Sequence, residues 1–463
     1  MKRTKIFFIN GIILTLTALI MRSIGMLFGL YVSNKIGSEA VGTFSLVMSV
    51  YMFFVIIATS GLNLACTCIV SEQFAKGNFF DGLKAIKSCI LFGLLLGLGS
   101  SLMIILFSNV ISTNWLKATV SPMPLYIIAI GLPFISISAV ISGYFSAVRK
   151  GYKSAFAQGF ELFIKIIVTL LLFKYYLPSN IEAICICLIL ADVISEICSC
   201  ILLITLCKND SIKYSKRTVT QITFKRKIFK IALPVAITSY IRSGLSTLKQ
   251  FIIPSRLMLY GLSYGMALSE YGKINGMTMA ILTFPTVFIM SFSNLLIPEF
   301  SSLLAQKYIK RILEVCKKVF FTTSLFSISC TIIFLFFADN ISIIAFKNLE
   351  CAKYIRILSP LIIFIYTDNI LDCMLKGLNK QTGVVIVNII DLVLTISILY
   401  FLLPTFGLAG YLLAIIVSEI FNFCISYFQL YKATGFKPTA SIICCYLFFA
   451  FIGFYNIISI FLH

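Results

Sequence analysis

Four cations inside long apolar segments are the side chains best able to bind a ligand. Arg242, Lys249 and Arg256 follow one another at intervals of seven residues, and Arg22 lies in an earlier apolar segment. Seven residues make about two helical turns, so we expect the three later cations to share one helix face. Like charges on one face repel and need water, acidic partners or an anionic ligand. Because the guanidinium fork suits phosphate and Lys adds a point charge, the pattern predicts a cationic cavity that binds an anionic substrate.

Acidic side chains inside other apolar segments offer an alternative explanation of these cations. The acids available are Asp192, Glu196, Asp368 and Asp372. Asp368 and Asp372 are spaced i,i+4, so they can lie side by side on one helix and hold Na⁺ or a proton between them. The simpler interpretation is that they neutralise cations of another helix. Glu161 and Lys165 have the same spacing and are expected to pair on their own helix.

The cysteines do not form a metal-binding pattern. There are 15, mostly inside apolar segments, and three pairs are spaced C-x-C. On a helix this spacing puts the two thiols about 200° apart, which is a poor geometry for one metal ion. We interpret them as small apolar fillers and expect no metal site and no cofactor.

The composition indicates the kind of structure that must position these charges. Of 463 residues, 60% are hydrophobic and 12% are charged, and the mean hydropathy is +1.02. These values exclude a soluble enzyme, a disordered chain and a secreted disulfide scaffold. Apolar runs as long as 90–107 and 442–462 also argue against a membrane β-barrel. The expected fold class is an all-α polytopic membrane protein.

About 20 residues of helix cross a bilayer, and the chain has room for thirteen such segments. We place them at 6–32, 43–70, 86–108, 122–147, 156–177, 182–207, 229–254, 267–297, 319–340, 355–376, 383–404, 409–431 and 440–461. With the N-terminus in the cytoplasm, the cytoplasmic segments hold 26 Lys and Arg and the outer ones hold 7. The positive-inside rule therefore fixes this orientation in the cytoplasmic membrane, with His463 outside. It also explains the net charge of +21 without a nucleic-acid partner.

The two halves of the chain resemble each other. Repeat-related positions include Arg22 and Arg242, Gly42 and Gly272, Pro133 and Pro360, Glu161 and Asp391, and Glu196 and Glu419. Six helices per half is an even number, so the two copies point the same way, as in transporters that bind substrate between two lobes. We predict a lobe at 1–207, a basic cytoplasmic linker at 208–228, a second lobe at 229–431 and an additional C-terminal helix at 432–463.

Several segments resemble a known family. They are RSIG at 22–25, KIGSEAVG at 35–42, SGLN at 60–63, SEQFAKGN at 71–78, SGYF at 142–145 and QGFE at 158–161. Together they resemble the stage V sporulation protein B and polysaccharide flippase family, which is related to lipid II flippases. The resemblance implies the MATE-like fold of two pseudo-symmetric six-helix bundles in a V, and Arg22 matches the family's first-span arginine. Ser142, Ala147 and Lys165 depart from the family pattern.

The expected function is that of a flippase rather than an enzyme. The resemblance implies that it moves a polyprenyl-pyrophosphate-linked oligosaccharide or cell-wall precursor across the membrane by alternating access. We expect Arg22, Arg242, Lys249 and Arg256 to hold the pyrophosphate, and Asp368 and Asp372 are candidates for coupling to Na⁺ or H⁺. The expected partners are this substrate and membrane lipids, and the expected oligomeric state is a monomer.

Three alternatives remain at this point. A multidrug cation antiporter of the same fold would need an acidic cavity, and the predicted one is basic. A membrane-embedded transferase would need a catalytic constellation on a sizeable outer loop, and the outer loops are short. A non-transporting scaffold for cell-wall or spore-coat assembly is the third alternative.

Overall fold

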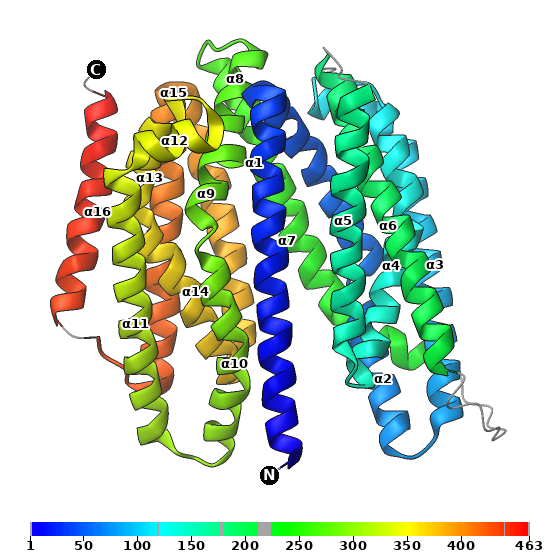
Figure 1. The fold of residues 1–463 in the computed structure, drawn as a ribbon. Coiled ribbons are helices and arrows are strands. Elements are labelled where there is room, and N and C mark those ends of the chain that lie inside the picture. Colours follow the sequence, from blue (N-terminus) through cyan, green and yellow to red (C-terminus); the bar gives the residue numbers. More distant parts are fainter. Residues whose placement is uncertain (1, 118–119, 176–179, 212–223, 439, 462–463) are drawn as a thin grey trace. The chain divides into compact units, whose positions relative to one another are not determined.

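The computed structural model describes residues 2–117, 120–175, 180–211, 224–438 and 440–461, and nearly all of them are helical (Figure 1). Across these ranges no β-strand is present. The chain divides into two compact units. Unit 1 consists of Met1–Gly42 and Leu248–His463, and unit 2 consists of Thr43–Thr247. The long helices α1 (Lys2–Thr59) and α7 (Lys225–Leu259) each contribute residues to both units.

Unit 2 is completed by five α-helices and one short π-helix. These are α2 (Leu62–Ala75), α3 (Phe79–Val110), η1 (Ile111–Trp115), α4 (Met123–Ala147), α5 (Gly151–Tyr175) and α6 (Ile181–Ser211). Its core forms where α2, α3 and α4 meet, around Leu62, Cys66, Cys89 and Tyr144, all of which are fully buried. Cys66 and Cys89 therefore act there as small apolar side chains.

Unit 1 contains the remaining helices. They are α8 (Tyr264–Tyr271), the π-helix η3 (Gly272–Thr278), α9 (Met279–Thr283), α10 (Thr286–Ala305), α11 (Ile309–Phe336), α12 (Ala338–Phe346), α13 (Glu350–Leu358), the 3₁₀ turn η4 (Ser359–Leu361), α14 (Ile362–Gly377), α15 (Gln381–Thr434) and α16 (Ala440–Phe461). The predicted segment 267–297 thus corresponds to a broken helix running from α8 to α10, and the predicted segment 355–376 to α13 and α14.

Two glycines interrupt the longest helices. Gly37 in α1 has φ 80° and ψ 168°, and Gly407 in α15 has φ 53° and ψ −130°. These backbone conformations suit Gly because it lacks a Cβ.

Nine helices among the described residues are long and apolar enough to span a membrane. The broken helix α15 contains the predicted segments 383–404 and 409–431, whereas α1 contains 6–32 and the first part of 43–70, which continues in α2. The helices thus confirm the all-α polytopic fold class.

The internal repeat is visible in matching hydrogen bonds. Thr67 Oγ1 donates to the carbonyl of Gly143 at 3.0 Å, and Ser301 Oγ donates to the carbonyl of Gly377 at 3.0 Å. The two bonds join corresponding helices, but Ser301 lies 234 positions after Thr67, about one helical turn more than the 230 that separate the turn residues Gly77 and Lys307. A Cβ on Gly143 would lie 2.5 Å from a carbonyl oxygen of α2, and one on Gly377 would lie 3.0 Å from a carbonyl oxygen of α10. The same close helix packing therefore requires glycine in both units.

A second matching pair joins the next helices. Ser101 Oγ donates to the carbonyl of Ala129 at 2.6 Å, and Thr331 Oγ1 donates to the carbonyl of Ser359 at 3.3 Å. These contacts support the repeat inferred from the sequence. The lobe boundaries 1–207 and 229–431 stay a prediction, and residues 212–223 of the predicted linker lie outside the described residues.

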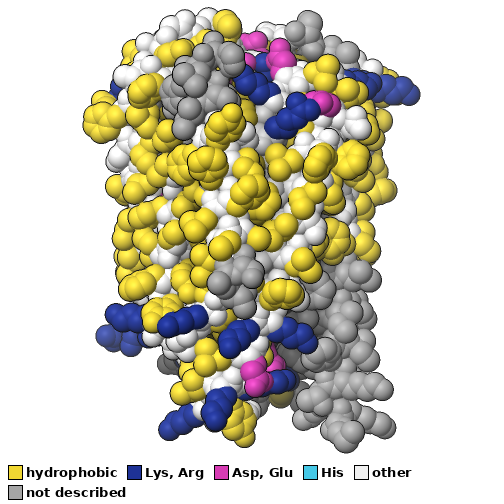
Figure 2. Space-filling view, turned by 90° about the vertical axis from the view of Figure 1, so that its left-hand side faces the viewer, with side chains coloured by type: hydrophobic (Ala, Val, Ile, Leu, Met, Phe, Trp, Pro, Cys, Tyr) yellow, Lys and Arg dark blue, Asp and Glu magenta, His cyan; other side chains and the backbone are white. Residues whose placement is uncertain are grey.

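The outer surface of the helices is apolar. Leu91, Leu95, Leu102 and Leu106 of α3 are between 56% and 67% exposed. Figure 2 shows the same property on another face, where hydrophobic side chains cover the middle and Lys and Arg gather towards the ends. An apolar surface of this extent is unstable in water and is stable in the hydrocarbon core of a bilayer. The chain is therefore a multi-pass membrane protein.

Candidate functional site

Arg22 lines a cavity of about 410 Å³ in unit 1. The α1 side of the cavity consists of Arg22, Gly25, Met26, Gly29, Leu30 and Ser33. The other side comes from η3, α9 and α10, with Gly276, Ala280, Thr283, Phe284, Thr286 and Val287. Arg22 is the one charged residue among these lining residues. The cavity therefore offers a single guanidinium in surroundings of small, apolar and hydroxyl side chains.

Small residues on α1 create this space. Gly25 and Gly29 are four residues apart and lie on the face that lines the cavity. A Cβ at Gly29 would meet no atom within 4 Å. The opposite wall is shaped by η3, since a π-helix inserts an extra residue into a turn and such turns often occur at functional sites. The sequence predicted Arg22 as a ligand-binding cation, whereas the π-helix has no reliable sequence signal.

Arg256 lies against an aromatic ring. Its guanidinium carbon is 3.4 Å from the centroid of the Tyr400 ring, which belongs to the first half of α15. A guanidinium stacked on an aromatic face gains a cation–π interaction and needs no acidic partner. The predicted anion-binding role of Arg256 is untested, but in this arrangement its guanidinium joins α7 to α15.

Lys249 lies near two acids of α15. It interacts electrostatically with the carboxylates of Asp391 and Glu419. Asp391 also accepts a hydrogen bond from Ser418 Oγ at 2.7 Å. Lys249 therefore has acidic neighbours within unit 1, although they are not the four acids named in the alternative explanation of the cation stripe. Arg242 belongs to unit 2, where its side chain is exposed, and its grouping with Arg22 stays a prediction.

Asp368 and Asp372 have different surroundings although they are neighbours on α14. Asp372 forms an ion pair with Lys376 at 3.3 Å. Asp368 is buried, and its Oδ2 accepts a hydrogen bond from Asn422 Nδ2 of α15 at 3.0 Å. Ser426 also interacts with the Asp368 carboxylate. The structure therefore separates the predicted carboxylate pair into one exposed ion pair and one buried acid.

Two buried oxygens beside Asp368 lack a donor. Among the described residues, neither Asp368 Oδ1 nor Asn422 Oδ1 has a hydrogen-bond partner. Buried acceptors without a donor are rare in folded proteins, because the lost hydration is not replaced. A proton on the carboxylate, a small cation or a water molecule would satisfy them. The sequence pointed to Asp368 but could not identify Asn422, which lies on a different helix.

Unit 2 contains an acidic cluster that the sequence predicted only in part. Lys165 of α5 forms an ion pair with Asp192 of α6, whereas pairing with Glu161 on the same helix was expected. Glu161 interacts electrostatically with Lys165 and lies near Ser199, whose hydroxyl donates to the carbonyl of Ala157 at 3.3 Å. The helix spacing correctly placed Glu161 beside Lys165, but it carries no information about acids on α6.

A second network, which the sequence analysis missed, surrounds Lys273 in η3. Lys273 Nζ contacts Glu270 Oε1 at 2.9 Å and also forms an ion pair with Glu350 of α13. Tyr354 donates a hydrogen bond to Glu270. The spacing of Glu270 and Lys273 was the available signal. The two acids and the tyrosine hold the π-helix against α13.

Repeat-related glycines contact each other where α1 crosses α8 and η3. A Cβ on Gly42 would lie 2.1 Å from the carbonyl oxygen of Leu268, and a Cβ on Gly272 would lie 2.1 Å from the carbonyl oxygen of Ser38. The hydroxyls of Ser38 and Ser269 are 2.7 Å apart. Each glycine thus packs on the backbone that surrounds the other, which is the reciprocal pattern of a two-fold axis.

Comparison with known proteins gives consistent matches. The family model described as "polysaccharide biosynthesis protein" matches residues 8–304. Stage V sporulation protein B of Bacillus subtilis (strain 168) is 23% identical over 428 residues, covering 89% of this chain and 81% of that protein. Sporulation protein YkvU of the same organism is 20% identical over 407 residues, covering 85% and 88%.

Solved structures with the same fold are transporters. The inward-facing conformation of a multidrug resistance MATE family transporter has a TM-score of 0.70 at 14% identity, covering 91% of this chain and 98% of that chain. A MOP superfamily transporter from Pyrococcus furiosus Vc1, whose reversed pocket polarity is taken to suggest a different function, has a TM-score of 0.64 at 14% identity, covering 91% and 96%. At this identity the likeness confirms the MATE-like fold and nothing beyond it.

Proposed function

The chain belongs to the polysaccharide biosynthesis protein family, and we propose that it is a flippase for a polyprenyl-pyrophosphate-linked oligosaccharide or cell-wall precursor. In this proposal it works by alternating access in the cytoplasmic membrane, with its N-terminus in the cytoplasm. The family and the transporter fold support a membrane transporter. The substrate and the orientation are our inferences.

The cavity at Arg22 is the observation that carries this proposal. Among the described residues that line it, Arg22 is the one charged side chain, so an anion is the ligand that it complements. Pyrophosphate offers several oxygens to the planar guanidinium fork, which can bind two of them at once. A multidrug cation antiporter would instead need an acid at this position. The volume of about 410 Å³ lies within the usual range of ligand pockets.

The remaining cations of the predicted site differ in what they can contribute. Lys249 lies near Asp391 and Glu419, and Arg256 lies against the Tyr400 ring. Each must leave these neighbours before it can bind an anion. We therefore propose that Arg22 and Arg242 provide the main contacts to pyrophosphate. Lys249 and Arg256 would join them in a later conformation or act mainly to hold α7 on α15.

We further propose that Asp368 couples transport to Na⁺ or H⁺. Its unpaired Oδ1 and the unpaired Oδ1 of Asn422 are both buried, and oxygen atoms are the ligands of Na⁺. Protonation of Asp368 would satisfy the same atoms by turning one acceptor into a donor. Asp372 is the weaker candidate because it is already paired with Lys376.

The test is a flipping assay with the purified protein in vesicles and fluorescent polyprenyl-pyrophosphate sugars. We expect Arg22→Ala to abolish flipping, and Arg22→Lys to keep part of it, because the charge remains without the bidentate fork. Lys35→Ala is the matched control, since it removes an exposed cation from the same helix outside the cavity. It should flip like the wild type.

Three results would contradict the proposal. Normal flipping by Arg22→Ala would remove Arg22 from the substrate site. Efflux of cationic dyes without flipping of any lipid-linked sugar would identify a multidrug antiporter. An absence of transport for all headgroups, in a correctly folded preparation, would favour a scaffold.

A further inference from the structure

The turn between α10 and α11 carries a concentration of positive charge. Over residues 307–318 there are five cations, Lys307, Lys310, Arg311, Lys317 and Lys318, and one carboxylate, Glu314. All six side chains are exposed. We call this segment the basic turn. Within it Arg311 is paired with Glu314 at 2.9 Å, so the four lysines retain the excess charge.

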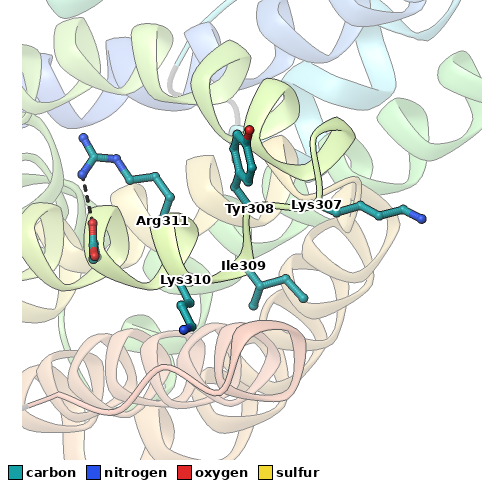
Figure 3. Close-up of a pocket in the computed structure, with 6 residues that line it drawn as sticks. Lys307, Tyr308, Ile309, Lys310 and Arg311 are labelled. Carbon is teal, nitrogen blue, oxygen red and sulfur yellow. Dashed lines mark hydrogen bonds and ion pairs between the residues drawn. The ribbon is translucent and has the colours of Figure 1, made fainter.

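A cavity of about 430 Å³ lies at the start of the basic turn. Its lining consists of Lys307, Tyr308, Ile309, Lys310, Arg311 and Glu314. In Figure 3, Tyr308 and Arg311 point to one side of the chain, Ile309 and Lys310 point to the other, and Lys307 extends away from them. The cations therefore do not converge on one phosphate. They are spread in a way that suits several anionic groups on a surface.

The internal repeat provides a comparison within the same chain. The equivalent turn has the same backbone hydrogen bonds: Gly77 N donates to Phe74 O at 3.1 Å, and Lys307 N donates to Leu304 O at 3.0 Å. Both turn residues have positive φ, 79° for Gly77 and 58° for Lys307. Glycine adopts this conformation without strain, whereas lysine does so rarely.

The two turns differ in charge although their geometry is the same. Residues 77–88 hold two cations, Lys84 and Lys87, and one carboxylate, Asp81, against five cations and one carboxylate in the basic turn. Asp81 is buried, whereas Arg311 at the equivalent position is exposed. The geometry of the turn therefore does not require the additional cations.

The surroundings of the basic turn identify a lipid surface as its partner. Tyr308 and Ile309 are 59% and 62% exposed beside the lysines, and farther along α11 the apolar Phe321 and Leu325 are 54% and 57% exposed. Lipid tails would cover that part of α11 in a bilayer, which places the turn at headgroup depth. Exposed aromatic residues and Lys or Arg at this depth are typical of contacts with headgroups. A soluble acidic partner would not explain the exposed apolar side chains.

We propose that the basic turn binds the headgroups of acidic phospholipids, with Lys307, Lys310, Lys317 and Lys318 contacting phosphate groups and Tyr308 and Ile309 inserted between lipids. The site is separate from the Arg22 cavity and does not depend on the transported substrate. The equivalent turn at residues 77–88 is proposed to contact lipid without this preference.

The experiment compares two double variants that lose the same charge. Lys310→Gln with Lys317→Gln changes the basic turn, and Lys84→Gln with Lys87→Gln changes the equivalent turn. Each full-length protein is reconstituted in nanodiscs of phosphatidylcholine with some phosphatidylglycerol, and the phosphatidylglycerol retained per protein after mild extraction is measured by mass spectrometry. We expect the first variant to retain less by roughly threefold or more, and the second to match the wild type.

Flipping activity and melting temperature of each variant in pure phosphatidylcholine show whether it is folded. An equal loss of phosphatidylglycerol in both variants, or no loss in the first, would overturn the proposal. A test with inorganic phosphate in detergent could also overturn it. If phosphate shifts the melting temperature of the wild type but not that of the first variant, the ligand is a soluble anion. Failure of flipping in all conditions would contradict the proposed function but would not change the lipid measurement.

Discussion

At the scale of single residues, the cations of α7 are distinguished by their partners. Helical periodicity predicted that Arg242, Lys249 and Arg256 share a face, but the partners of the last two lie on α15, more than 100 residues later. A spacing rule applies within one helix and contains no information on which distant helix packs against it. The sequence therefore predicted the charges correctly and could not distinguish a ligand-binding cation from one held by an aromatic ring.

A double-mutant cycle between Arg256 and Tyr400 tests this distinction. We expect Arg256→Gln and Tyr400→Leu each to lower the thermal stability of the protein, with a coupling free energy of about 0.5–2 kcal/mol, because each removes one side of the cation–π contact. Arg22→Ala should leave the melting temperature close to that of the wild type while it abolishes flipping. If Arg256→Gln instead lost flipping without losing stability, Arg256 would belong to the substrate site.

The buried carboxylate of Asp368 gives a second residue-level prediction. Asp368→Asn removes the ionisable group but keeps the size of the side chain and a hydrogen-bonding partner for Asn422. We expect flipping to lose its dependence on a Na⁺ or proton gradient. Its rate should fall to the rate that the wild type shows when no gradient is applied. Asp372→Asn, on the same helix, is the control and should keep the dependence, because Asp372 is already paired with Lys376. A gradient response that survives in Asp368→Asn would exclude this carboxylate as the coupling group.

At the scale of the helices, close packing depends on glycines at repeat-related positions. Gly42 and Gly272 were matched from the sequence, but their contact with each other was not predicted. A Cβ at either position would come within 2.1 Å of a carbonyl oxygen, so the backbones of α1 and α8 touch. We expect Gly42→Ala to destabilise the protein and lower its yield in the membrane. Gly29→Ala should be tolerated in stability, because its Cβ would meet no atom within 4 Å.

The same crossing allows a test of how the helices move. In alternating access the end that is closed in one state opens in the other, and we propose that α1 and α8 separate at this crossing during transport. Replacing Ser38 and Ser269, whose hydroxyls are 2.7 Å apart, with Cys would allow a disulfide between α1 and α8. We expect oxidation to block flipping and reduction to restore it, measured in a background without the native cysteines. Full activity of the oxidised protein would mean that the crossing is a fixed pivot.

At the scale of the whole molecule, composition and periodicity predicted the fold class because each membrane span needs a long apolar stretch. Gly37 and Gly407 lie in the short stretches 33–42 and 405–408 that separate predicted segments. The π-helix η3 was harder to predict, because it lies inside the predicted segment 267–297 and depends on contacts such as those of Lys273. The wall of the Arg22 cavity that faces α1 includes Gly276 of η3, so the sequence identified the charge of the cavity but could not predict this wall.

Orientation in the membrane is the last prediction and follows from the charge distribution. The segments placed in the cytoplasm hold 26 Lys and Arg, against 7 in those placed outside, and such a bias sets the direction of insertion. Single cysteines introduced next to Lys310 and next to Lys347, in a background without the native cysteines, should therefore react differently in intact cells. Lys310 lies in the first turn of α11, and Lys347 follows α12, which comes after the other end of α11. We expect a membrane-impermeant maleimide to label the Lys347 position from outside and the Lys310 position only after permeabilisation. The reverse result would place the basic turn at the outer leaflet, and the N-terminus would then lie outside as well.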